Sequence, residues 1–278
     1  MMMTSKTPCG LALFLSVVVP GGALACETQL SRTARVVEII DGQTVRLDDG
    51  NVVRLMGALA PEAPPWWKGP GEWPPSKRAR TGLADLVQDK QIEVRFAGME
   101  TKRDRHERLL AQAYLVNGTE RIWAQGHMIR RGLARSYSLK GHFGCARDLQ
   151  RLERDARGAR LGVWRKAYYS ITQAASPKKL SKRLGSFQLV EGLITSVGVV
   201  RQWTFLNFSN DWRSDFTVAI KAGDRKRFLS RGLDLGKLEG KKVLVRGWIE
   251  RWNGPAIKAT HPEQIEVRTE ANSPSSGK

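Results

Sequence analysis

The sequence has few of the side chains that build metal centres and covalent catalytic sites. It holds three cysteines and four histidines in 278 residues. None of the histidines has metal-type spacing to a cysteine or to another histidine, so no zinc site is predicted. Neither a glycine-rich phosphate loop nor a nucleophile elbow appears. The chain therefore lacks the motifs that define P-loop nucleotidases and α/β-hydrolases.

Long apolar runs are also scarce. Leu11–Val19 is apolar but too short to span a bilayer, and Lys6 precedes it. Ala23-Leu24-Ala25 then has the small-x-small pattern of a cleavage site. These features predict a signal peptide at 1–25 and an exported protein, secreted or periplasmic. No later stretch is long and apolar enough to be a transmembrane helix.

The scarce cysteines fit an exported chain. Cys9 would leave with the signal peptide, so Cys26 and Cys145 would remain. An even pair in an oxidising compartment predicts one disulfide. Acylation of Cys26 as a lipoprotein is the alternative. It is disfavoured because Ala23 stands where leucine is usual and Leu24 stands where a small residue is usual.

Acidic residues are outnumbered by basic ones. The chain has 27 Asp and Glu against 46 Lys and Arg, which gives a net charge of +19 and a pI of about 10.3. A surplus of this size favours a polyanionic partner, either nucleic acid or an anionic membrane surface. Some exported proteins are basic without such a partner, so charge alone does not decide. The length allows two small domains.

Residues 34–168 have the pattern of a mixed α and β domain. Alternating apolar residues from Thr33 to Leu55, with turns at 41–42 and 48–50, predict a β-meander. A loop rich in Pro, Gly and Trp follows at 61–75, and Ser76 is positioned to cap a helix. Further elements are predicted as strands at 92–96 and 109–116 and as helices at 122–131 and 145–159.

The second half predicts a smaller β domain. Residues 169–186 are polar and basic and are interpreted as a linker, and the tail 269–278 is predicted to be disordered. Five strands with one helical interruption in 187–268 favour a small barrel of the oligonucleotide-binding type over an immunoglobulin-like sandwich. Its inward-facing positions are predicted to be Val190, Leu193, Val218 and Val245. The whole chain is thus predicted to be mainly β, of the α+β class, with two barrels.

Four motifs in the first half occur in a characteristic order. They are D-G-x-T at 41–44, R-L-x-G-x-x-x-P-E at 54–62, D-R-x-x-R-L-L-A at 104–111 and G-H-M-I-R-R-G-L-A at 126–134. In this order they resemble the thermonuclease, or staphylococcal-nuclease-like, family over nearly all of residues 34–165. The resemblance implies a five-stranded barrel with helices and an action on the phosphodiester bonds of nucleic acid.

The same resemblance implies roles for individual residues. Arg54 and Arg108 match the two catalytic arginines, and the guanidinium fork suits two phosphate oxygens at once. Glu62 matches the carboxylate proposed as general base. Arg105 and His106 fall where the family contacts the terminal phosphate and the base of the nucleotide.

Two positions depart from the family. Its calcium-ligating aspartates are replaced here by Gln43 and Leu59. Ala60 can still offer a backbone oxygen, and Asp41 matches an outer-shell residue at best. Because carboxylates contribute most to calcium binding, the affinity should fall by orders of magnitude. No metal ligand is assigned, which leaves a weak or altered divalent cation as the open alternative.

Aromatic side chains offer further candidates for nucleic-acid binding. Tyr137 lies near the segment from which the family draws its aromatic pocket residues. In the second barrel, Trp203 and Phe205 share one face of a strand and either bind bases or form core. Trp212 and Arg213 are predicted to lie in a turn, so they are the favoured binding residues there.

Several functions stay open at this point. The site can hydrolyse slowly without metal, recruit another cation near Glu62, or hold phosphate without cutting it. The alternative to a nuclease is a non-catalytic extracytoplasmic protein that binds DNA, RNA or another polyanion. An envelope module that meets anionic lipid or polysaccharide is a third interpretation of the positive charge.

Overall fold

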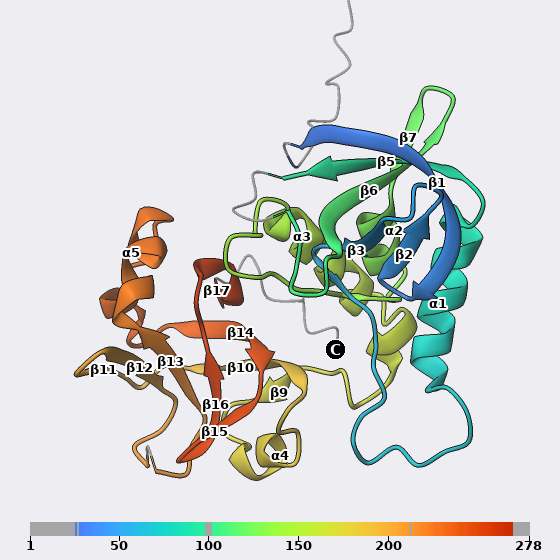
Figure 1. Ribbon diagram of the computed structural model, residues 1–278. Helices are drawn as coiled ribbons and strands as arrows, with labels where there is room; N and C mark the ends of the chain where they lie inside the picture. Colours follow the sequence, from blue (N-terminus) through green and yellow to red (C-terminus); the bar gives the residue numbers. More distant parts are fainter. Residues whose placement is uncertain (1–25, 27, 98–101, 212, 269–278) are drawn as a thin grey trace, which may run out of the picture.

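The computed structural model in Figure 1 describes residues 26, 28–97, 102–211 and 213–268. The predicted signal peptide at 1–25, Trp212 and the predicted disordered tail at 269–278 lie outside the described residues. Within those described ranges, no helix combines the length and the hydropathy needed to cross a membrane. The chain is rich in strands, as predicted.

The N-terminal barrel is built from five strands. The main sheet has the order β3-β2-β1-β5-β6-β7, and β3 also pairs in parallel with β6, so β1, β2, β3, β6 and β5 close on themselves. This confirms the predicted five-stranded barrel with helices. The elements are β1 (Gln29–Asp41), β2 (Thr44–Leu47), β3 (Val52–Leu55), β4 (Ala58–Leu59), α1 (Pro74–Val87), β5 (Gln91–Phe96), β6 (Leu109–Asn117), β7 (Glu120–Trp123), α2 (Ala124–Arg130), β8 (Arg135–Ser136), α3 (Ala146–Gly158) and η1 (Gly162–Arg165).

Alternation along the strands produces the core of this barrel. Val36, Val45 and Val53 are buried and pack with Leu83 of α1, which runs along one side of the barrel (Figure 1). The predicted cap by Ser76 is wrong, because α1 begins at Pro74 and no side chain caps it. Proline suits the first turn since its missing N–H needs no partner there. The Ser76 hydroxyl instead donates to the Pro61 carbonyl (2.5 Å), which fixes the loop beside Glu62.

The C-terminal barrel repeats the same connectivity. Its elements are β9 (Thr172–Gln173), α4 (Pro177–Ser181), β10 (Phe187–Leu193), β11 (Ser196–Val200), β12 (Trp203–Asn207), β13 (Thr217–Lys221), α5 (Ala222–Ser230), η2 (Leu235–Leu238), β14 (Lys242–Trp248), β15 (Glu250–Trp252), β16 (Gly254–Lys258), η3 (Pro262–Gln264) and β17 (Ile265–Val267). Strand β13 pairs in parallel with β16, and β10 pairs antiparallel with β14. The hydrogen bonds divide these strands into two sheets around one apolar core rather than a single closed ring.

Two details of this half differ from the predictions. Leu193 is 53% exposed rather than inward-facing, because it lies three residues from buried Val190 and so points to the opposite face of β10. The stretch 169–186 is not an unstructured linker. Thr172 pairs with Val190, and the Arg183 guanidinium donates to the Gln188 side chain (2.7 Å).

A disulfide closes the N-terminal end of the described chain. Cys26 and Cys145 are bonded across 119 residues, with their Cα atoms 4.9 Å apart. The bond ties the start of the described chain to the residue before α3. A cross-link over so long a loop restricts the unfolded chain and so stabilises the fold.

An apolar seam joins the two barrels. Side chains from both halves pack in one buried cluster, which we call the apolar seam. Its members are Met56, Leu59, Leu110, Tyr137, Ala156, Val163, Trp164, Tyr169, Phe187, Leu189 and Leu244. The barrels therefore share a buried apolar core and are not independently packed domains.

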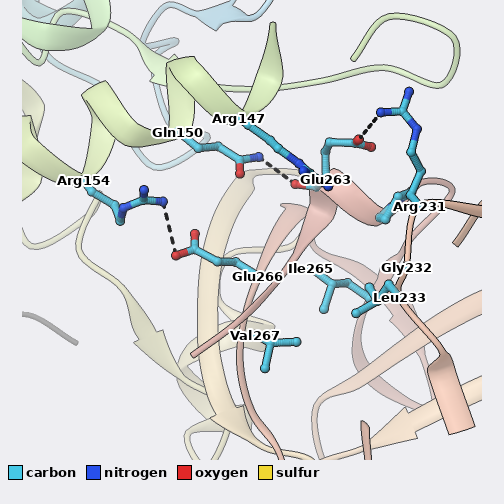
Figure 2. Close-up of a pocket in the computed structure, with 11 residues that line it drawn as sticks. Arg147, Gln150, Arg154, Arg231, Gly232, Leu233, Glu263, Ile265, Glu266 and Val267 are labelled. Atoms are coloured by element: carbon cyan, nitrogen blue, oxygen red, sulfur yellow. Dashed lines mark hydrogen bonds and ion pairs between the residues drawn. The ribbon is translucent and has the colours of Figure 1, made fainter. Parts of the chain in front are cut away.

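Buried polar contacts line the other side of the seam. Arg246 of β14 is 1% exposed and pairs with Glu153 of α3 (2.7 Å). Figure 2 shows the neighbouring hollow, of about 300 Å³, between α3 and the η3–β17 segment. Arg154 pairs there with Glu266 (3.4 Å). Ion pairs between opposite charges therefore connect the two barrels at this hollow.

His261 is a buried neutral group at the same contact. Its Nε2 lies 2.7 Å from the Ser138 hydroxyl of the other barrel, and its Nδ1 lies 2.9 Å from the Thr260 hydroxyl. Burial and, to a smaller extent, the charge of Arg227 lower the pKa of His261 to about 4, while Asp224 acts in the opposite direction. Between pH 6.5 and about pH 4, His261 is therefore neutral in the folded protein but protonated in the unfolded chain.

This difference in protonation predicts a loss of stability in acid. Between the ordinary His261 pKa of 6.5 and about 4, the unfolded state binds more protons, so the free energy of unfolding falls as the pH falls. The contribution of His261 to this fall should approach roughly 3 kcal/mol. Denaturant titrations from pH 7 to pH 4 should show a smaller fall for His261→Gln. The exposed histidine variant His106→Gln should behave as the unsubstituted protein does, and equal falls in all three would contradict the assignment.

Candidate nucleic-acid interface

Two arginines come together at one end of the N-terminal barrel. Arg54 lies in β3, and Arg108 comes directly before β6, with which β3 is paired in parallel. The positive charges of both guanidiniums influence the pKa of the Tyr137 hydroxyl. Burial raises the pKa of Tyr137 to about 12, and the positive charges of Arg54 and Arg108 oppose that rise. We call Arg54 and Arg108 the arginine pair.

Asp104 holds Arg108 in place. The Arg108 Nε donates to the Asp104 carboxylate (2.8 Å), and its Nη2 lies 2.6 Å from the same oxygen. The other carboxylate oxygen accepts the backbone N–H groups of His106 (2.9 Å) and Arg108 (3.1 Å). Burial alone would raise the pKa of Asp104, but these hydrogen bonds outweigh it and lower the pKa. The remaining Nη1 of Arg108 can donate to a ligand.

Arg54 has a different environment. Its side chain is half-buried, and within the described residues no carboxylate forms an ion pair with it. Arg108 is thus paired with Asp104, whereas Arg54 forms no such ion pair among the described residues. A half-buried cation without a carboxylate partner is suited to an anion from solution.

Glu62 lies in an adjoining cleft. Its exposed side chain lines a cavity of about 140 Å³ together with Arg135, Tyr168, Phe187 and Trp248. Its negative charge acts on buried Arg135. The structure thus brings Arg54 and Arg108 to the same end of the barrel near Tyr137. Glu62 lies in a separate cleft whose walls come from both barrels, and Trp248, which lines that cleft, contacts Tyr137.

The calcium positions of the family are filled differently. The Gln43 side-chain oxygen accepts the backbone N–H of Ala60 (2.9 Å), and the Asp41 carboxylate accepts the N–H of Gln43 (2.7 Å). Leu59 is 4% exposed and belongs to the apolar seam. No group of three or more His, Cys, Asp or Glu side chains in the described residues is placed to hold a metal ion. These residues do not fit the calcium site of the family.

The other predicted contacts lie on exposed turns. Arg105 and His106 are exposed beside Arg108, and the Arg105 Nε donates to the His106 ring (3.1 Å). Arg213 is exposed in the turn between β12 and β13, whereas its predicted partner Trp212 lies outside the described residues. Arg105 and His106 are therefore near the arginine pair, while Arg213 belongs to the other barrel.

The C-terminal barrel carries an aromatic face that the sequence only partly indicated. Trp203, Phe205 and Trp252 are half-buried and contact one another, with ring centroids 4.5 to 6.4 Å apart. Lys221 lies over Trp203 and Lys258 over Trp252, each at 5.7 Å. Phe205 and Trp252 line a hollow of about 420 Å³. The core residues of β12 are Thr204 and Leu206, so Trp203 and Phe205 face outward.

Comparison with known proteins agrees with the geometry. Residues 52–166 match the family model described as staphylococcal nuclease homologue. This part of the chain is a staphylococcal nuclease homologue domain. Arg54, Glu62 and Arg108 all lie within the match, and the C-terminal barrel lies beyond it.

Two curated relatives are similar to part of the chain. "Probable endonuclease lcl3" of Pyrenophora tritici-repentis (strain Pt-1C-BFP) is 32% identical over 117 residues, which are 41% of this chain and 41% of that protein. "Probable endonuclease LCL3" of Phaeosphaeria nodorum (strain SN15) is 30% identical over 117 residues, 41% of this chain and 38% of that protein. The chain thus spans about two fifths of the length of these relatives.

The place of Leu59 in the apolar seam generates a prediction about stability. Leu59→Asp puts a carboxylate into a buried cluster shared by both barrels, next to its cross-strand neighbour Arg135. Because desolvation should outweigh the attraction to Arg135, the free energy of unfolding should fall by about 1–4 kcal/mol. Leu59→Met should cost less than about 1.5 kcal/mol. Leu229, which is 64% exposed in α5, offers the matched control, because Leu229→Asp should have little effect. Chemical denaturation measures all three, and a Leu59→Asp variant that is well tolerated and binds calcium would contradict this account of the site.

Proposed function

We propose that the chain acts on nucleic acid and that the arginine pair grips a phosphodiester group. The observation that carries this proposal is the parallel pairing of β3 with β6, which brings Arg54 and Arg108 to one end of the barrel, where both positive charges act on Tyr137. Asp104 orients one guanidinium, and the other has no carboxylate partner among the described residues. The family match and the names of the two relatives support the same substrate class.

Hydrolysis is the reaction that such a grip would serve. Negative charge builds on the phosphate oxygens as water attacks phosphorus, and two guanidiniums stabilise that charge. Glu62 would take the proton from the attacking water, while the bond to the leaving oxygen breaks. The exposed carboxylate of Glu62 in the adjoining cleft supports this role. No step is assigned to calcium, since Gln43 and Leu59 do not fit it.

Binding without cleavage is the second candidate function. It is favoured by the two replaced calcium positions, because a metal usually supplies a large part of the stabilisation in phosphodiester cleavage. The aromatic face also supports binding, since bases of a single strand stack on aromatic rings in a cationic groove. Lys221 and Lys258 supply the positive charge beside those rings.

We further propose that the protein works outside the cytoplasm. The pattern of residues 1–25 and the disulfide between Cys26 and Cys145 support export, because disulfides persist in oxidising compartments. Extracellular or periplasmic DNA or RNA would then be the substrate class.

One assay separates the candidate functions. Labelled single-stranded DNA and RNA are incubated with the protein in calcium, magnesium, manganese or a chelator, and both cleavage and binding are followed at physiological salt. Arg54→Ala and Arg108→Ala should weaken binding and lower any cleavage by about 100-fold or more. Glu62→Gln should abolish cleavage and leave binding in place, because it removes only the base.

Arg80→Ala is the matched control, since Arg80 of α1 forms an exposed ion pair with Glu72 in the preceding loop. It should change neither readout by much. Equal losses of binding or cleavage for Arg80→Ala and Arg108→Ala would show that the effect comes from the lower net charge of the protein and not from a specific site. If DNA and RNA stay uncut under every condition, binding without cleavage is the candidate function that remains. Competition by an unrelated polyanion as strong as that by single-stranded DNA would instead favour a general polyanion binder.

The aromatic face gives a separate prediction. Trp252→Ala should weaken binding of single-stranded DNA by about 5- to 100-fold, because stacking contributes about 1–3 kcal/mol per base. Duplex DNA should be affected far less, since its bases are already stacked. Fluorescence anisotropy with both probes measures the difference, and Leu229→Ala serves as an exposed apolar control. Equal losses for single strand and duplex would show that the rings do not stack on bases.

A further inference from the structure

Trp248 is an exposed tryptophan at the junction of the two barrels. It is the last residue of β14 and pairs in register with Phe187 at the start of β10. The five residues before it, from Val243 to Gly247, are buried, yet Trp248 is 40% exposed. Its position therefore leaves indole surface open where most of the strand is enclosed.

Two ring contacts fix the Trp248 side chain. Its ring lies 5.4 Å from that of Tyr137 at an interplanar angle of 87°, and 5.0 Å from that of Phe187 at 73°. Tyr137 and Phe187 are both buried in the apolar seam. Edge-to-face contacts of this kind hold an aromatic ring in one orientation. The indole is thus a rigid surface and not a loose side chain.

Trp248 also lies between the charged groups of the candidate site. On one side its ring contacts that of Tyr137, on which the positive charges of Arg54 and Arg108 act. On the other side it lines the cleft that contains Glu62. A nucleotide whose phosphate lay on the arginine pair would therefore have this indole as a neighbour.

We propose that Trp248, which belongs to the C-terminal barrel, supplies the base-stacking surface for the nucleotide whose phosphate is held by Arg54 and Arg108. This inference rests on the proposed function. Because stacking needs only the flat face of a base, the contact would be tolerant of sequence. The nucleotide site is then built by both barrels, and the family domain alone lacks this stacking surface.

The test compares two small probes on the full chain. Thymidine 5′-monophosphate carries sugar, phosphate and base, and deoxyribose 5-phosphate lacks the base. Calorimetry gives the affinity of each, and their ratio isolates the contribution of the base. Trp248→Ala should weaken binding of the nucleotide by about 5- to 100-fold and leave the sugar phosphate unchanged. Trp248→Phe should retain most of the ratio, which separates stacking from a packing defect.

Two further variants distinguish the possible failures. Arg108→Ala should weaken both probes, and Leu229→Ala, an exposed substitution in α5, should leave the ratio unchanged. If Trp248→Ala leaves the ratio unchanged while Arg108→Ala weakens both probes, Trp248 does not stack on the base. A ratio that falls with Trp252→Ala instead would place the base on the aromatic face. If the unsubstituted protein binds neither probe, the phosphate grip itself is wrong and this inference falls with it.

Discussion

The apolar seam is the constraint on which the candidate site depends. Leu59 packs there with Tyr137 from its own barrel and Phe187 from the other. The same packing that joins the barrels thus occupies the position where the family uses a calcium-ligating aspartate. A carboxylate at this point would carry a desolvation cost that attraction to the cross-strand residue Arg135 would only partly offset. Loss of the metal ligand and association of the barrels are therefore two aspects of one contact.

The arginine pair survives this change because it is positioned by separate interactions. The parallel pairing of β3 with β6 brings Arg54 and Arg108 to one end of the barrel, and Asp104 orients Arg108. Neither interaction uses the residues that would hold calcium. The site thus keeps its means of neutralising a phosphate, while Gln43 serves as a hydrogen-bond partner of the backbone. What remains is electrostatic recognition of an anion next to a cleft that both barrels form.

Local patterns predicted much of the fold but little of the contact between barrels. Strand alternation identified the barrel strands, and the order of motifs pointed to Arg54 and Arg108. The prediction that Leu193 faces inward with Val190 was wrong, because strand alternation places residues three apart on opposite faces. The polar composition around Arg183 predicts a linker, yet its guanidinium bonds to several buried partners. Nothing local marks Trp248, because Phe187 is distant in sequence and Tyr137 comes from the other barrel.

The central claim is that one phosphate lies between Arg54 and Arg108. A crystal structure of the full chain with a short single-stranded oligonucleotide tests it most directly. The account predicts phosphate oxygens within hydrogen-bond distance, about 2.7–3.2 Å, of both guanidiniums. A strand bound only to the aromatic face of the C-terminal barrel, with Arg54 and Arg108 contacting no phosphate, would contradict it.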